Sequence, residues 1–230
     1  MGILADALAI VAGGLLGGTL LKRNGDNNYT ILGISIIMLS LVGFIENVCR
    51  VDGETIAGEN LLVVLFAFLI GSKVGEKLQI EQRLSNLSRT SNKQFNAFVD
   101  AALFFGVGGL QISGSILLAL NNDSSQLFIK ALVDLPLAIA FGATYGKVVS
   151  LSALPVALVQ VLIAVIAYYL SGFFSDEMTT GLCAMGYIIL FFSGFNLITN
   201  GKYKINNINM LPGIVLVMVF NGILGVMGRV

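Results

Sequence analysis

The chain has 230 residues, of which 56% are hydrophobic and only 11% are charged. A typical soluble domain carries about 25% charged residues, so this composition excludes an ordinary soluble domain and a disordered chain. The low charged fraction also excludes a nucleic-acid-binding protein of the basic-patch kind. Thirteen basic and thirteen acidic residues give a formal net charge of zero, so only the distribution of charge along the chain is informative. The composition instead predicts an all-α polytopic bundle of transmembrane helices, with the lipid bilayer as its main partner.

Residue types that are missing or rare exclude several kinds of chemistry. The sequence contains no histidine, and therefore no imidazole base and no histidine-ligated zinc. Its two cysteines, Cys49 and Cys183, form no CxxC motif, and a disulfide between them would require that both face an oxidising compartment. No nucleotide-binding motif is present. We therefore predict that the protein is not an enzyme and uses no cofactor, while its metal content stays open.

Eight apolar segments approach or exceed the roughly 20 residues that a helix needs to cross a bilayer. In chain order they are 3–21, 28–47, 58–76, 97–120, 126–148, 150–172, 177–199 and 207–228. Alternate crossing places most of the basic residues on one side, namely Lys22, Arg23, Lys73, Lys77, Arg83, Arg89, Lys93, Lys147, Lys202 and Lys204. Because cytoplasmic loops are rich in Lys and Arg, this side is the cytoplasm and both termini lie outside.

The first and fifth spans resemble each other. An alignment that matches Asp6 with Asp134 also matches Gly14 with Gly142. This similarity predicts a repeat of two halves, 1–96 and 97–230, within a single transmembrane domain, 1–230, with 76–96 as a cytoplasmic polar segment. Both spans carry GxxxG motifs, which let helix backbones approach closely. The motifs either pack helices within one chain or form a homodimer.

The fourth span contains three glycines in four residues, from Gly106 to Gly109. Since glycine costs about 1 kcal/mol relative to alanine inside a helix, this run predicts a break, and the alternative is close helix packing. Polar residues follow at once: Gln111, Ser113 and Ser115, directly after Gly108 and Gly109. A broken helix at membrane depth is tolerated where protein or a water-filled cavity satisfies its backbone, so these residues are candidates to line a solute path.

The fifth span carries charged residues within the membrane. Lys130 and Asp134 are four residues apart and share a helix face, and Pro136 leaves the carbonyl group of Leu132 without its helical donor. Asp6 lies at a similar depth in the first span, so the two carboxylates could bind a cation or share a proton. The alternative is an ion pair near the outer interface.

Two further polar residues lie within spans. Gln160 in the sixth span and Asn196 in the seventh must each find a partner or border a cavity. They either hold helices together or contact a solute.

Several short motifs occur along the chain: Asp-Ala-Leu-Ala-Ile from Asp6, Gly-Ser-Lys-Val-Gly at 71–75, Lys-Ala-Leu-Val-Asp at 130–134, Leu-Ser-Ala-Leu-Pro at 151–155 and Asn-Met-Leu-Pro at 209–212. In these motifs the chain resembles the YqgA/YdfK family of uncharacterised prokaryotic membrane proteins. The resemblance implies a multi-pass protein of the prokaryotic inner (plasma) membrane and supplies no reaction or substrate. It matches Lys130 and Asp134, whereas the position of Asp6 usually holds asparagine in the family.

These features together favour a transporter. We expect it to move a small solute or ion, with Asp134 binding the coupling cation or proton. The alternatives are an oligomeric ion channel on the same scaffold, or a membrane scaffold without transport whose polar residues only hold helices together.

Overall fold

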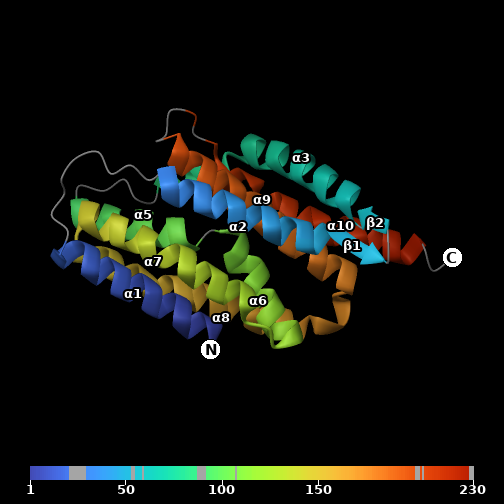
Figure 1. Ribbon diagram of the computed structural model, residues 1–230, viewed down its shortest axis with the longest axis horizontal. Helices are drawn as coiled ribbons and strands as arrows, with labels where there is room; N and C mark the ends of the chain where they lie inside the picture. Colours follow the sequence, from blue (N-terminus) through green and yellow to red (C-terminus); the bar gives the residue numbers. More distant parts are fainter. Residues whose placement is uncertain are drawn as a thin grey trace. The chain divides into compact units, whose positions relative to one another are not determined.

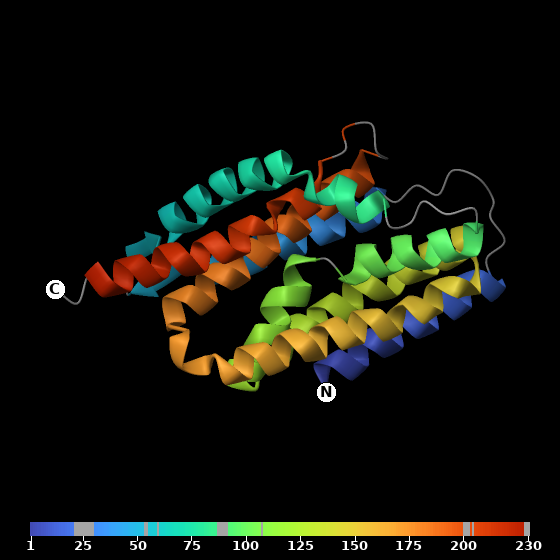
Figure 2. The ribbon, with the colours of Figure 1, turned by 180° about the vertical axis from the view of Figure 1, so that it is seen from behind.

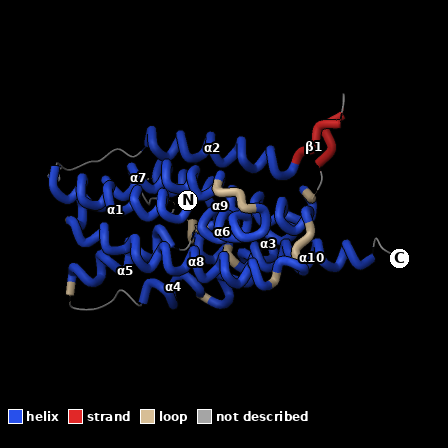
Figure 3. The backbone as a smooth tube through the Cα atoms, turned by 90° about the horizontal axis from the view of Figure 1, so that it is seen from below, coloured by secondary structure: helices blue, strands red, loops and turns tan. Residues whose placement is uncertain are grey.

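The computed structural model describes residues 1–20, 30–52, 55–58, 60–86, 92–106, 108–199, 203 and 205–227. These residues are almost entirely helical, as the tube in Figure 3 shows. The α-helices are α1 (Gly2–Leu20), α2 (Thr30–Val48), α3 (Leu61–Leu78), α4 (Ile80–Ser85), α5 (Lys93–Gly106), α6 (Gly109–Asn121), α7 (Ser125–Tyr145), α8 (Ala153–Tyr169), α9 (Asp176–Ile198) and α10 (Pro212–Met227). Three short 3₁₀ helices are η2 (Lys147–Ser152), η3 (Ser171–Phe173) and η4 (Asn207–Met210).

Six helices within the described residues are long and apolar enough to cross a membrane. They correspond to the first, second, fifth, sixth, seventh and eighth spans expected from the sequence. The pair α5 and α6 counts as a seventh if its two helices form one bent span. Helix α3 coincides with the remaining expected span and carries Lys73, Glu76 and Lys77 near its end. The chain is thus a helical protein of the multi-pass membrane type.

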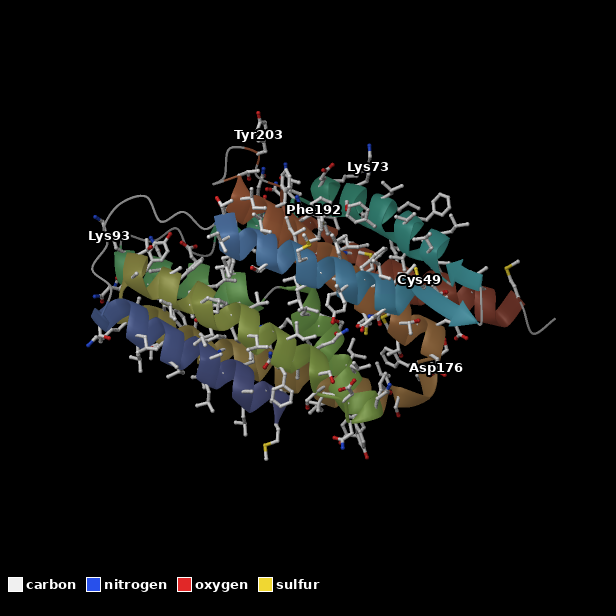
Figure 4. All side chains as sticks on the ribbon, in the orientation of Figure 1. Cys49, Lys73, Lys93, Asp176, Phe192 and Tyr203 are labelled. Carbon is white, nitrogen blue, oxygen red and sulfur yellow. The ribbon has the colours of Figure 1, made fainter. Side chains whose placement is uncertain are left out.

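A small β-hairpin lies between α2 and α3. Strands β1 (Cys49–Asp52) and β2 (Thr55–Gly58) pair antiparallel. The β-branched residues Val51, Thr55 and Ile56 favour extended backbone. Cys49, labelled in Figure 4, begins this hairpin, and no disulfide joins it to Cys183.

The structure divides into two compact units that interleave along the sequence. Unit 1 comprises Met1–Asn27 and Gln82–Ser171, and unit 2 comprises Asn28–Glu81 and Gly172–Val230. This division differs from the halves 1–96 and 97–230. The first span joins the fifth in unit 1, so the two segments that resemble each other in sequence pack together.

Helices α1 and α7 of unit 1 lie side by side and are in contact along their length (Figures 1 and 2). Gly13 contacts the segment at Leu135 and Ala138, and Gly17 contacts Ile139 further along, so the two helices run parallel. A methyl group on Gly17 would overlap the carbonyl oxygen of Ile139. The GxxxG face of α1 therefore packs within the chain, which is the first of the two interpretations offered above.

Unit 2 uses small residues in the same way. Gly33 of α2 packs on Gly194 of α9, and Gly71 of α3 packs on Gly213 of α10. The ring of Phe192, labelled in Figure 4, stacks on Phe68 of α3 with a centroid distance of 5.7 Å. Close backbone contact and dispersion between apolar side chains hold such helices together where lipid removes the hydrophobic driving force.

The segment of the fourth expected span forms two helices, which are separated where the glycine run predicts a break. Helix α5 ends at Gly106, α6 begins at Gly109, and the two axes differ by 55°. A methyl group on Gly108 would have nothing within 4 Å, and one on Gly106 would make only an ordinary contact with Val156. Since neither glycine is needed for close packing, the break is the better explanation of the motif.

Part of the basis for the predicted orientation lies outside the described residues. This applies to Lys22, Arg23, Arg89, Lys202 and Lys204. Of the predicted cytoplasmic segment 76–96, the structure describes the end of α3, then α4, and the start of α5, with Lys93 (Figure 4) as the first residue of α5.

Candidate functional site

Three polar side chains lie on one face of α7. Gln126, Lys130 and Asp134 are spaced by four residues, so they project from the same side in successive turns. All three are buried, with exposed fractions of 4%, 5% and 6%. This helix face is turned toward protein and not toward lipid.

Lys130 connects two helices through two carboxylates. Its Nζ donates a hydrogen bond to Oδ2 of Asp6 on α1 at 2.8 Å, and another to Oδ2 of Asp134 on its own helix. The parallel packing of α1 on α7 brings Asp6 to this position. The sequence predicted the pair on α7 from its spacing, and the structure adds the third charge.

Two glutamines extend the contacts to α6 and α8. Gln160 on α8 donates through Nε2 to Oδ2 of Asp6 at 2.7 Å and to Oε1 of Gln111 at 2.9 Å. Gln111, in the first turn of α6, donates in turn to the carbonyl oxygen of Val156 at 3.0 Å. Gln111 and Gln160 are both fully buried. We call Asp6, Gln111, Lys130, Asp134 and Gln160 the buried polar cluster.

Two oxygen atoms of this cluster have no hydrogen-bond donor. They are Oδ1 of Asp6 and Oε1 of Gln160, and both belong to side chains with no exposed surface. A buried acceptor without a partner costs roughly 1–3 kcal/mol. Each of these two oxygens is therefore an atom at which a donor or a cation would be stabilised.

The charges of the cluster do not balance. Two carboxylates and one ammonium group leave one negative charge when all three are ionised. Asp134 lies roughly 13 Å along α7 from Ser125, and Asp6 about 6 Å along α1 from Gly2, at 1.5 Å per residue. A net charge within an apolar bundle is costly, so a proton or a bound cation is expected to neutralise it.

An aromatic cluster follows on the same helix as the polar one. Phe141 of α7 lies 4.8 Å from Phe104 and 5.6 Å from Phe105 of α5, measured between ring centroids, and 5.7 Å from Tyr145. Phe104 and Phe105 end α5 directly before the break. The aromatic cluster therefore lies between the buried polar cluster and the end of α7 at Tyr145.

The other predicted site residues have partners elsewhere. Ser113 donates to Oε1 of Gln126 at 2.6 Å, and Ser115 donates to the carbonyl oxygen of Gln111 in its own helix. Gly108 adopts an extended conformation before α6, and Gly109 is the first residue of that helix. Asn196 belongs to unit 2.

In unit 2, Asn196 holds the backbone at Ile205. Its Nδ2 donates to the carbonyl oxygen of Ile205 at 2.7 Å, and its Oδ1 accepts from the amide of that residue at 2.8 Å. This pair of bonds closes the connection between α9 and η4, which is a structural role.

Comparison with known proteins places the chain in a family. The model of the family described as "Protein of unknown function (DUF554)" matches residues 1–221. The chain belongs to the DUF554 family. It is also similar to the uncharacterized protein YqgA of Escherichia coli (strain K12), with 24% identity over 231 residues, covering 95% of this chain and 94% of YqgA. No solved structure matches it.

In this DUF554 protein a buried polar residue of α7, Gln126, bonds a predicted site residue but was not itself predicted. It is the partner of Ser113, and it stands one turn before Lys130 on the same face. The four-residue spacing of Gln126, Lys130 and Asp134 was a readable signal, but Gln126 lies at the boundary of the expected span.

Replacing Ser113 with alanine is expected to lower the free energy of unfolding by about 1–3 kcal/mol. The change leaves Oε1 of Gln126 buried without its donor, whereas the pair Ser113→Ala with Gln126→Leu removes both groups and should recover most of the loss. Ser35→Ala on α2 is the control, because that hydroxyl is exposed and bonds only its own helix. Denaturant unfolding in detergent measures all four proteins, and equal losses for Ser113→Ala and Ser35→Ala would contradict the expectation.

Proposed function

We propose that this DUF554 protein is a transporter of a small solute or ion, coupled to a cation or proton that binds the buried polar cluster. The observation that carries the proposal is the sharing of one buried ammonium group by two buried carboxylates from different helices. Ionisable groups within membrane spans commonly mark ion or proton paths. The excess negative charge of the cluster attracts a cation. The ammonium group of Lys130 can then shift from one carboxylate to the other.

Lys130 acts as an internal counter-ion in this proposal. When a cation or proton reaches Asp6 or Asp134, it competes with the ammonium group for the negative charge of the same carboxylate group. Binding therefore weakens the contact between α1 and α7 that Lys130 makes, and unbinding restores it. Such a competition couples occupancy of the site to the packing of two helices.

The break between α5 and α6 lies next to the cluster and would allow these two helices to move relative to each other. Gln111, in the first turn of α6, belongs to the cluster, and Phe104 and Phe105 end α5 on the other side of the break. A change in the 55° angle would displace the aromatic cluster relative to the polar one. We expect the aromatic cluster to close the cytoplasmic side of the path in the present state.

The proposed location is the inner membrane of a prokaryote, with both termini outside. The biased distribution of basic residues supports this orientation. The parallel run of α1 and α7 agrees with an even number of crossings from the first span to the fifth, since both helices then cross in the same direction. A homodimer would use surfaces other than the glycine face of α1, which α7 covers. In this proposal Lys130 acts through its charge and not as a nucleophile, because an ammonium group that is ion-paired with two carboxylates has no free electron pair.

Asp134→Asn is expected to abolish transport while the protein still folds, because Lys130 keeps Asp6 as a partner. Purified protein in liposomes with a trapped pH-sensitive dye would be given gradients of sodium, potassium or protons, and flux would be measured against concentration. Asp100→Asn is the matched control, since Asp100 is an exposed carboxylate on α5 of the same unit and should leave flux unchanged.

Other outcomes of the flux measurement would indicate a channel or a scaffold. Unitary currents that do not saturate would indicate a channel. If no gradient produces flux and Asp134→Asn only lowers stability, the protein is a scaffold and the transport proposal is wrong.

A further inference from the structure

We infer that the buried polar cluster is a binding site for one small, dehydrated monovalent cation such as sodium, with Oδ1 of Asp6 and Oε1 of Gln160 among its ligands. The inference rests on the proposed function, because it names the coupling ion of that same site.

Hydrogen bonding fixes which oxygens remain available. Oδ2 of Asp6 already accepts from both Lys130 and Gln160, which leaves Oδ1 without a donor. The amide of Gln160 uses Nε2 to donate to two acceptors, Oδ2 of Asp6 and Oε1 of Gln111. Turning this amide over would set its oxygen against those two acceptors, so Oε1 is held in its unpartnered position by the network.

The type of ligand follows from the atoms that are free. Both are oxygens, one from a carboxylate and one from an amide, and such oxygens are the ligands that hard cations take. Asp6 and Gln160 have no exposed surface, so a cation that bound both oxygens would have lost most of its water. A large organic cation such as choline would not fit.

The charge of the ion follows from the cluster as a whole. The ionised cluster carries one excess negative charge, which a single monovalent cation neutralises. A divalent cation would replace a charge of minus one with a charge of plus one.

The test is thermal unfolding of the purified, full-length protein in sodium chloride against choline chloride at equal ionic strength. Sodium at ten times its dissociation constant should raise the melting temperature by about 4 °C. Asp6→Asn should lose this shift, because it removes the excess charge and replaces a carboxylate ligand with an amide. Asp100→Asn should keep the full shift. Bound radioactive sodium should approach one ion per wild-type chain.

A second variant guards against a failure of Asp6→Asn to fold. Gln160→Met keeps the side-chain length and removes the amide oxygen, so it should weaken sodium binding at least tenfold. Equal melting temperatures in sodium and choline, or a sodium shift that survives in both variants, would overturn the inference.

Transport measured on the same preparations separates this inference from the proposed function. If a proton gradient drives flux but the protein does not bind sodium, the transport proposal is supported and the sodium site is wrong. If the protein binds sodium but shows no flux, the sodium site is supported and the transport proposal is wrong.

Discussion

Replacing Lys130 with methionine is expected to lower the free energy of unfolding by about 3–5 kcal/mol. The variant keeps the length of the side chain and removes the only cation that contacts Asp6 and Asp134 among the described residues. Two carboxylates then remain buried in an apolar bundle without a counter-ion. Unfolding of the purified protein in a graded mixture of detergent and denaturant would give the difference.

Neutralising both carboxylates should reverse most of this loss. The triple variant Lys130→Met, Asp6→Asn, Asp134→Asn carries no charge in the cluster, and amides can bond to Gln160 and to each other. Lys93→Met is the control, because Lys93 is exposed at the start of α5 and should change stability by less than about 0.5 kcal/mol. If Lys130→Met proves as stable as the Lys93 control, the two carboxylates are not charged in the folded protein.

Replacing Gly17 with valine is expected to prevent α1 from packing on α7. The new side chain would overlap the carbonyl oxygen of Ile139, and the amide nitrogen of Ala143 also lies close. Because backbone atoms of a helix cannot move aside as a flexible side chain would, the helices must separate. We expect a loss at the upper end of the 1–3 kcal/mol range for overpacking, or beyond it, together with a loss of sodium binding, since Asp6 moves with α1.

The matched control for this change is Gly225→Val. Gly225 lies near the end of α10, and a methyl group there would have nothing within 4 Å. Both changes carry the same difference in helix propensity between glycine and valine, so the comparison isolates the close contact. Size-exclusion chromatography and melting temperature would be measured for both variants, and an unaffected Gly17→Val protein would refute the described packing.

Local patterns in the sequence were sufficient to predict the parts of the site that depend on neighbouring residues. The four-residue spacing of Lys130 and Asp134 predicted an ion pair on one helix face. The three glycines between Gly106 and Gly109 predicted the helix break. Both features follow from the geometry of a single helix, which has the same period in every protein.

Contacts between distant segments could not be predicted in this way. The sequence around Asp6 does not show that its carboxylate contacts Lys130, because that contact depends on which helix packs against the glycines of α1. Ser113 and Ser115 were expected to line a path, and in the structure Ser113 bonds Gln126 while Ser115 bonds its own helix. Apolar helices offer many faces of similar composition, so the fit between surfaces decides which helices meet.

The interleaving of the two units has a consequence during biosynthesis. Asp6 and its ammonium partner are 124 residues apart in the chain, and a ribosome adds about 5–20 residues per second. Lys130 is therefore synthesised roughly 6–25 s after Asp6, and for that time Asp6 has no ammonium partner. During that interval we expect either that the insertion machinery shields Asp6 from lipid or that Asp6 is protonated, until α7 is inserted.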